Sequence, residues 1–329
     1  MRTDRTDSSA HPVFSLIVRA TQPAAAMSAA PQFDCASTPR LTALVVGPDS
    51  KLAATISDLL PDWNIEQARD NVAALTLIAH KAFDLVLTGL ETSGHSDVAL
   101  LRKLRFVRPH TRLIILTNNS TPADVIASMR EHAFCYFSSP ISWPALADVM
   151  RSVSQSPSWD DGIEVLSATP AWIRLAARCD VATADRLLQF FHELADLPEP
   201  DKTNVGSAFR EMLLNAIEHG GRLNPDHYVE ISYVHATHVV MCRVKDPGEG
   251  FSLDEIQHAA IANPPDDPLR HQTHREAEGL RPGGFGVLLT RSFVDEVIYS
   301  EKGNEVLLIK YMRPPGRKGP SGEPASVAN

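Results

Sequence analysis

Three segments in the second half of the chain combine polar side chains with glycines in patterns that could hold a charged ligand. The segment FREMLLNAIEHGG contains Glu211 and Asn215, which lie one turn apart if the segment is helical. DPGEGF places Asp246 directly after an apolar run, and RPGGFG directly precedes another. Carboxylate and amide oxygens are hydrogen-bond acceptors and Mg²⁺ ligands, and glycines let a ligand approach the backbone. These residue types favour chemistry on a phosphorylated ligand.

The first segment fits an amphipathic helix. At about 100° per residue, its apolar residues cover much of the helix surface. Its polar residues gather on one face, namely Glu211, Asn215, Glu218 and His219. Gly220 and Gly221 follow and supply the backbone freedom expected just beyond a helix C-terminus.

Strands and a second helix are expected around the other two segments. HYVEISYVHA and HVVMCRVKD are typical of two strands, and the second runs into the turn at Asp246. The glycines of RPGGFG open an apolar helix, whose free N–H groups can receive phosphate oxygens. Ahead of them, IEVLSATPAWIRLAAR predicts a pair of strands, and residues 183–194 predict a helix.

In this order, the three segments resemble the N box and the two glycine boxes of the ATP-binding fold shared by gyrase, histidine kinases and anti-sigma factor serine kinases. The resemblance covers roughly residues 163–312 and implies ATP and Mg²⁺ as cofactors. It implies that Glu211 polarises an attacking hydroxyl and that Asp246 accepts a hydrogen bond from the adenine amino group. Asn215 would coordinate Mg²⁺. The cofactor-binding set is then Asn215, Asp246, Gly248, Gly250, Gly283, Gly284 and Gly286.

Each of these residues also has a plainer interpretation. Asp246 could simply form a turn, and Glu211 could make an ion pair on an exposed helix. The stretch between the glycine boxes lacks a compact metal-ligand pattern and fits a lid over ATP better. It contains His258, His271 and His274, together with Arg270, Arg275 and Arg281, which are either phosphate contacts or surface residues.

The first half of the chain alternates short apolar runs with amphipathic stretches. The runs are LTALVV, FDLVLT, RLIILT and FCYFSS, and the stretches cover residues 52–60, 71–80, 96–106, 122–132 and 143–153. Buried parallel strands are near-continuously apolar, and crossover helices join them. The sequence therefore predicts an α/β protein whose N-terminal domain is a doubly wound parallel sheet.

This rhythm resembles the receiver domain of two-component response regulators over roughly residues 41–153. Gly47 and Pro48 stand where the family has its Mg²⁺-binding acids, and Gly89 replaces the phosphoacceptor aspartate. Ser139 precedes Pro140 in place of the family's lysine. Of these family positions, only the hydroxyl switch residue is matched, by Thr117. Without carboxylates there is neither a metal cage nor a nucleophile. We expect a pseudo-receiver that docks a partner or self-associates; an inert structural appendage is the alternative.

Composition sets the remaining expectations. The chain has 329 residues and a net charge of -9, so no broad basic field attracts nucleic acid or anionic membrane. The four cysteines are scattered, and no apolar run is long enough to cross a bilayer, which favours the cytoplasm. The predicted organisation is a disordered tail at 1–40, the pseudo-receiver at 41–153, a linker at 154–162, an α/β-sandwich ATPase domain with a mixed sheet at 163–312, and a disordered tail at 313–329. Met27 is an alternative start to Met1.

The type of ATP-dependent activity is inferred from what precedes the ATP-binding segments. Residues 154–200 contain no convincing dimerisation helix with a phosphoacceptor histidine, and EMLLNAIEHG looks most like the anti-sigma kinase type. That resemblance implies a protein serine/threonine kinase that phosphorylates a small antagonist protein and sequesters a sigma factor in a partner-switching pathway. The alternatives are a non-catalytic, nucleotide-gated binding module and histidine-kinase-like transfer, and homodimerisation stays open.

Overall fold

The computed structural model describes residues 40–155, 161–250 and 286–312, together with single positions 267, 270, 273 and 277. The two expected tails, apart from Arg40, and most of the expected linker lie outside the described residues. These described residues form two sheets, and both belong to one unit that begins at Arg40. The expected domain boundaries stay a prediction.

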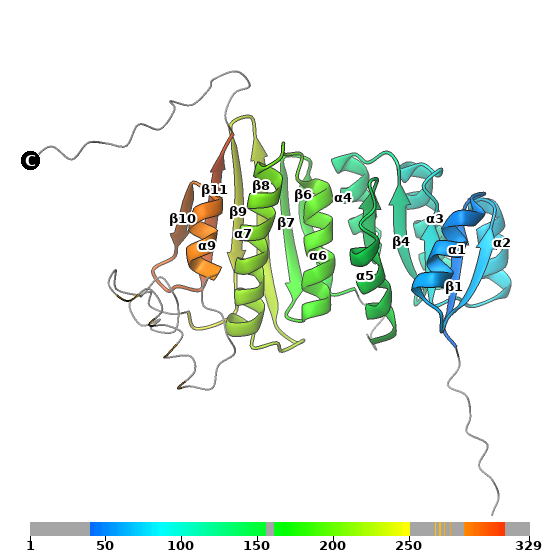
Figure 1. The fold of residues 1–329 in the computed structure, drawn as a ribbon, viewed down its shortest axis with the longest axis horizontal. Helices are drawn as coiled ribbons and strands as arrows, with labels where there is room; N and C mark the ends of the chain where they lie inside the picture. The colour runs from blue at the N-terminus through cyan, green and yellow to red at the C-terminus, as the bar shows by residue number, and fades with distance from the viewer. Residues whose placement is uncertain are drawn as a thin grey trace, which may run out of the picture. The chain divides into compact units, whose positions relative to one another are not determined.

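The first sheet has five parallel strands in the order β2-β1-β3-β4-β5 (Figure 1). Every residue of β3 and β4 is buried, as the apolar runs predicted for strands covered on both faces. One strand was not foreseen, because NIEQA is largely polar and lies at the sheet edge, where only its last residue is buried. The strands are β1 (Thr42–Val46), β2 (Asn64–Ala68), β3 (Leu85–Thr88), β4 (Arg112–Thr117) and β5 (Cys135–Ser138).

Five helices connect these strands and cover both faces of the sheet. Buried residues of α1 and α5 pack on one face, and buried residues of α2, α3 and α4 pack on the other. Side chains cap four of the helices, because Asp49, Asp70, Ser93 and Thr121 each accept a hydrogen bond from a first-turn N–H. The helices are α1 (Ser50–Leu59), α2 (Asn71–His80), α3 (Gly94–Val107), α4 (Pro122–Arg130) and α5 (Trp143–Gln155). This is the predicted doubly wound arrangement.

Within the described part of the chain, the second sheet has six strands in the order β10-β11-β9-β8-β7-β6. The five pairings between these described strands are all antiparallel, so the parallel pairing of the expected mixed sheet is not among them. Alternate residues along β7, β8 and β9 are buried, which leaves one face for helices. The strands are β6 (Ile163–Thr169), β7 (Trp172–Arg178), β8 (Tyr228–Ala236), β9 (Val239–Lys245), β10 (Glu296–Tyr299) and β11 (Glu305–Tyr311).

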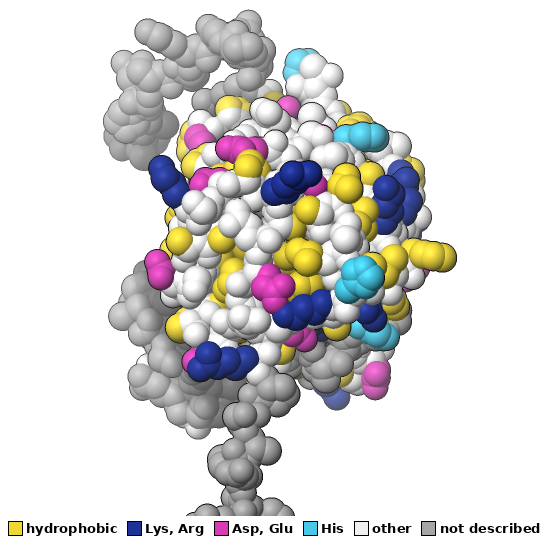
Figure 2. Space-filling view, turned by 90° about the vertical axis from the view of Figure 1, so that its right-hand side faces the viewer, with side chains coloured by type: hydrophobic (Ala, Val, Ile, Leu, Met, Phe, Trp, Pro, Cys, Tyr) yellow, Lys and Arg dark blue, Asp and Glu magenta, His cyan; other side chains and the backbone are white. Residues whose placement is uncertain are grey.

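Helices α6 (Val181–Leu194), α7 (Asp201–Asn215) and α9 (Gly286–Phe293) lie on one side of this sheet (Figure 1). A short π-helical turn, η1 (Ala216–Gly220), continues directly from α7. Within the described part of the chain, no helix is both long and apolar enough to span a membrane. On the face of the molecule in Figure 2, charged side chains of both signs are interspersed with apolar and histidine side chains.

Candidate functional site

The end of α7 departs from the regular helix that the sequence predicted. The helix begins earlier than the segment FREMLLNAIEHGG, at Asp201, and the chain continues after Asn215 as η1. Gly220 therefore lies inside the π-helical turn, and Gly221 follows it and donates its N–H to the Ala216 carbonyl at 2.7 Å. Regular 100° spacing does not continue through a π-helical turn, so the expected polar face ends at Asn215. His219 is exposed, whereas Glu211 and Asn215 are half-buried.

Glu211 and Asn215 face the beginning of α9. A β-carbon placed on Gly286 would lie 2.7 Å from Glu211 Oε2 and 3.8 Å from the Asn215 amide nitrogen. The absence of a side chain at Gly286 is what allows the first turn of α9 to approach both residues. This brings a carboxylate, an amide and a helix N-terminus together, although they come from segments about 70 residues apart in the sequence.

Asp246 follows the end of β9 and packs against η1. Its Oδ1 accepts a hydrogen bond from the Gly248 N–H at 2.8 Å, and burial raises the pKa of the carboxyl group. A β-carbon on Gly220 would lie 2.2 Å from Asp246 Cγ, so only glycine fits at position 220. The backbone of η1 and the carboxylate of Asp246 are thus in direct contact.

The turn after Asp246 is braced by residues that the sequence analysis missed. Asn304 Nδ2 donates to the carbonyls of Asp246 and Gly248 at 3.2 and 3.4 Å, and Lys302 Nζ donates to the Gly248 carbonyl at 3.1 Å. Gly250 has φ +84, and a β-carbon there would lie 1.8 Å from the Lys302 carbonyl oxygen. The β10–β11 turn therefore fixes the glycine turn at the end of β9. Its sequence, EKGN, carries no chemical pattern that could have revealed this role.

The structure thus places most of the predicted site residues around one end of the second sheet. Glu211, Asn215 and Gly286 form one group, and Asp246, Gly248 and Gly250 form another beside η1. Gly283 and Gly284 lie outside the described residues, as do His258, His271, His274, Arg275 and Arg281. Among the described residues, no three His, Cys, Asp or Glu side chains are grouped as a metal site.

In the first sheet, the position of the receiver phosphoacceptor has no room for a side chain. A β-carbon on Gly89 would lie 2.6 Å from the Val46 carbonyl oxygen, and one on Gly47 would lie 3.4 Å from Gly89 Cα. The loops after β1 and β3 are therefore in contact where the receiver family holds its acids. Thr117 is buried, and its hydroxyl donates to the Asn119 carbonyl at 2.9 Å.

A buried carboxyl group, which the sequence analysis did not single out, lies at the start of α3. Asp97 is fully buried and accepts hydrogen bonds from Thr92 Oγ1 at 2.7 Å and from Asn71 Nδ2 at 3.2 Å. Burial raises its pKa to about 6, although these hydrogen bonds favour the ionised form. Its position within an ordinary amphipathic helix gives no sequence signal of this environment.

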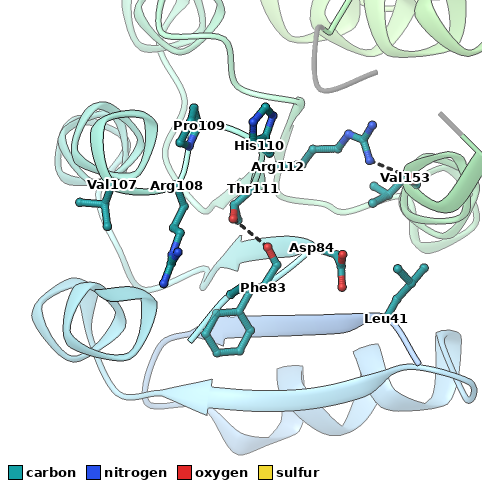
Figure 3. Close-up of a pocket in the computed structure, with 11 residues that line it drawn as sticks. Leu41, Phe83, Asp84, Val107, Arg108, Pro109, His110, Thr111, Arg112 and Val153 are labelled. Atoms are coloured by element: carbon teal, nitrogen blue, oxygen red, sulfur yellow. Dashed lines mark hydrogen bonds between the residues drawn. The ribbon is translucent and has the colours of Figure 1, made fainter. Parts of the chain in front are cut away.

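A cavity of about 380 Å³ opens at the amino-terminal ends of β1, β3 and β4 (Figure 3). Its polar groups are already engaged: Thr111 donates to the Phe83 carbonyl at 2.7 Å, and Arg112 donates to the Val153 carbonyl at 2.7 Å. Asp84 accepts the Thr42 N–H at 2.8 Å. The cavity contains none of the predicted site residues, so it does not belong to the candidate ATP site.

Comparisons with known proteins relate the second half of the chain to a family of ATPase domains. The model of the histidine kinase-like ATPase domain matches residues 175–310. Serine-protein kinase RsbW of Oceanobacillus iheyensis is 26% identical over 155 residues, which are 46% of this chain and 87% of that protein. Anti-sigma F factor of Bacillus cytotoxicus is 30% identical over 114 residues, which are 33% of this chain and 69% of that protein.

This chain belongs to the histidine kinase-like ATPase family. The membership implies ATP binding, and the two relatives support a place among the kinases of partner-switching pathways. A solved receiver domain from Pseudomonas fluorescens covers 35% of this chain and 95% of its own, with 24% identity and a TM-score of 0.33. The strand order β2-β1-β3-β4-β5 is itself that of the receiver fold. The predicted fusion of a receiver-like domain with an ATPase domain is confirmed.

Proposed function

We propose that this protein is an ATP- and Mg²⁺-dependent protein serine/threonine kinase of the anti-sigma factor type. The observation that carries the proposal is the grouping of Glu211 and Asn215 against the N-terminus of α9. A carboxylate beside an amide and free helix N–H groups suits phosphoryl transfer, in which positioning and electrostatics do most of the work. The names of the two relatives, a serine-protein kinase and an anti-sigma factor, support this class of activity.

The site has groups that fit both the base and the phosphates of a nucleotide. Asp246 would accept a hydrogen bond from the adenine amino group, and the lack of side chains at Gly220 and Gly248 would let the base approach the backbone. The N-terminus of α9, which begins at Gly286, would receive the phosphates, as would Gly283 and Gly284 ahead of it. Bound ATP would supply the phosphoryl group.

Two residues of α7 would bind the metal and orient the attacking hydroxyl. Asn215 would be the protein ligand of Mg²⁺, and phosphate and water oxygens would complete the octahedron. Glu211, one turn earlier, would orient and polarise the serine or threonine hydroxyl of the substrate.

The expected protein substrate is a small antagonist protein, and a sigma factor is the second expected partner. Both are proposed from the names of the relatives and would place the protein in the cytoplasm. Self-association as a homodimer stays open. The receiver-like domain is proposed to be a pseudo-receiver, because Gly89 has neither a carboxylate nor room for one.

The kinase proposal is tested by incubating native lysate with isotopically labelled ATP and the purified protein, with Asn215→Ala as the control. Labelled phosphoserine or phosphothreonine on a small protein, absent with the variant, would support it. Glu211→Ala should abolish transfer and leave ATP affinity largely intact, since Glu211 acts on the hydroxyl rather than on the nucleotide. Equal loss of binding and transfer would contradict the role given to Glu211.

The rival function is a nucleotide-gated binding module that performs no transfer. The receiver-like domain favours it, since Gly47, Pro48 and Gly89 stand where the receiver family has its Mg²⁺-binding acids and its phosphoacceptor aspartate. If the wild-type protein binds Mg-ATP but labels no substrate in the same experiment, the binding module becomes the better description.

A further inference from the structure

Helix α6 belongs to the second sheet, but one of its faces closes the free edge of the first. Glu193 accepts two hydrogen bonds from Ser138, at 2.9 Å from the backbone N–H and at 2.5 Å from the hydroxyl. Gln189 Nε2 donates to the Tyr136 carbonyl at 3.3 Å and to Glu193 Oε1 at 3.0 Å. An edge strand leaves its outer N–H and C=O groups unpaired. Here side chains of α6 form hydrogen bonds with an N–H and a C=O group of β5 that no neighbouring strand pairs.

A buried arginine extends this contact toward the beginning of α6. Arg186 is 4% exposed, and its guanidinium carbon lies 4.3 Å from the centroid of the Phe134 ring, next to β5. Arg186 also donates to the carbonyl of Asp161, which is itself 6% exposed. An arginine buried over an aromatic ring is a strong and geometrically specific contact. Two turns of α6 are therefore fixed against the receiver-like domain.

The opposite face of α6 packs on the helix that carries Glu211 and Asn215. Phe191 stacks on Phe209 of α7 with a centroid distance of 4.4 Å, and it meets Tyr233 of β8 edge-on at 5.3 Å. The packing here is apolar and leaves a small void, and among the described residues the Tyr233 hydroxyl has no hydrogen-bond partner. The described hydrogen bonds that restrict the position of α6 most closely are therefore those of Gln189 and Glu193 to β5.

We propose that Glu193 is a positioning residue of the nucleotide site. By tying α6 to Ser138 it sets the position of Phe191, and through Phe209 it sets α7, so that Glu211 and Asn215 face α9. Buried residues of the two sheets form one continuous core, which gives this coupling a physical path. The receiver-like domain then holds α6, and through it α7, in the position that the nucleotide site requires. This inference rests on the proposed binding of nucleotide.

The test compares Mg-ATP affinity by calorimetry in full-length variants. Glu193→Ala and Ser138→Ala should each weaken binding roughly 3- to 30-fold. The double variant should be no weaker than Glu193→Ala, because Ser138→Ala removes only the hydroxyl bond, which is one of the two bonds that Glu193→Ala already removes. Glu193→Gln should keep most of the affinity, since its amide can still accept from the Ser138 N–H and donate to the hydroxyl. Glu66→Ala is the matched control, because Glu66 pairs with Lys81 at the far edge strand β2.

A purely structural role for Glu193 is separated from coupling by a reciprocal measurement. Coupling requires that Mg-ATP stabilise the Glu193–Ser138 contact as much as the contact favours Mg-ATP. Hydrogen exchange at the Ser138 amide should therefore slow when Mg-ATP is added to the wild type, and should not respond in Glu193→Ala. Thermal unfolding establishes that each variant is folded before it is used.

The outcomes distinguish this inference from the function on which it rests. Unchanged affinity in folded Glu193→Ala and Ser138→Ala, or losses that multiply in the double variant, would overturn the positioning role and leave nucleotide binding intact. If the wild-type protein binds no Mg-ATP, the proposed function itself fails.

Discussion

Substituting Asp246 with asparagine should change which purine nucleotide the protein prefers. Oδ1 of Asp246 accepts the Gly248 N–H at 2.8 Å, so the amide oxygen of an asparagine would keep that bond. The amide nitrogen must then occupy the place of Oδ2. In the proposed site, Oδ2 is the atom that accepts a hydrogen bond from the adenine amino group. In Asp246→Asn, the side-chain NH₂ would face the adenine NH₂, and two donors cannot form a hydrogen bond with each other.

The size of the effect follows from the contact that is lost. A hydrogen bond to a charged group contributes about 1.5–3 kcal/mol, which corresponds to a loss of ATP affinity of roughly 10- to 150-fold. Inosine triphosphate has a carbonyl oxygen in place of the amino group, and that oxygen can accept from the new amide. The variant should bind it at least as well as the wild type does. Because burial raises the pKa of Asp246, a neutral side chain should cost the fold little.

The assay is calorimetric titration of wild type and Asp246→Asn with both nucleotides in the presence of Mg²⁺. The ratio of the ATP affinity to the inosine triphosphate affinity should fall by one to two orders of magnitude, that is, roughly the loss expected for ATP. Asp226→Asn, at an exposed position, serves as the matched control. If a folded variant loses affinity for both nucleotides by the same factor, Asp246 does not recognise the amino group and the reasoning fails.

Two further predictions concern the receiver-like domain. Gly89→Asp should lower the free energy of unfolding by about 1–3 kcal/mol in chemical denaturation, because its β-carbon would lie 2.6 Å from the Val46 carbonyl oxygen. It should also take up no phosphate from acetyl phosphate, and stable labelling would show that the pocket can open. Asp97 has its pKa raised to about 6, so the folded protein binds more protons than the unfolded chain between about pH 4 and about pH 6, and stability falls as the pH rises through that window. The stability of the wild type relative to Asp97→Asn should therefore drop by up to about 3 kcal/mol across it, and a pH-independent difference would contradict the buried-acid interpretation.

How far the sequence predicted the fold depended on burial. Strands β1, β3, β4 and β5 were located because they are covered on both faces and must be apolar. Strand β2 was missed because four of its five residues are not fully buried, so the apolar pattern is absent. Backbone pairing with β1 holds β2 in place, and because every residue type except proline has the same backbone groups, this pairing cannot be recognised from the side chains.

The candidate site shows the same limit at the level of single residues. Glu211, Asn215 and Asp246 were singled out from their types and spacing, and their proposed roles came from the resemblance to the ATP-binding fold. Asn304 was not, because it acts on carbonyls 56 and 58 positions earlier in the chain, and only the tertiary fold brings it there. The π-helical turn at Ala216–Gly220 was also missed, since the sequence there is compatible with a regular helix up to its glycines.

The polar face of α6 explains why the relation between the two domains could not be read from the sequence. Gln189 and Glu193 alternate with apolar residues as they would on a helix whose polar face meets water, and Arg186 fits the same pattern. In the structure these residues meet β5 instead, so their partners are main-chain atoms, Ser138 and the Phe134 ring. Gly89 leaves no room for an input by aspartate phosphorylation, whereas β5 is in contact with the helix that packs on α7. If Glu193 positions the site as proposed, a partner or ligand that shifts β5 also shifts α6 and, through Phe191 and Phe209, the helix that carries Glu211 and Asn215.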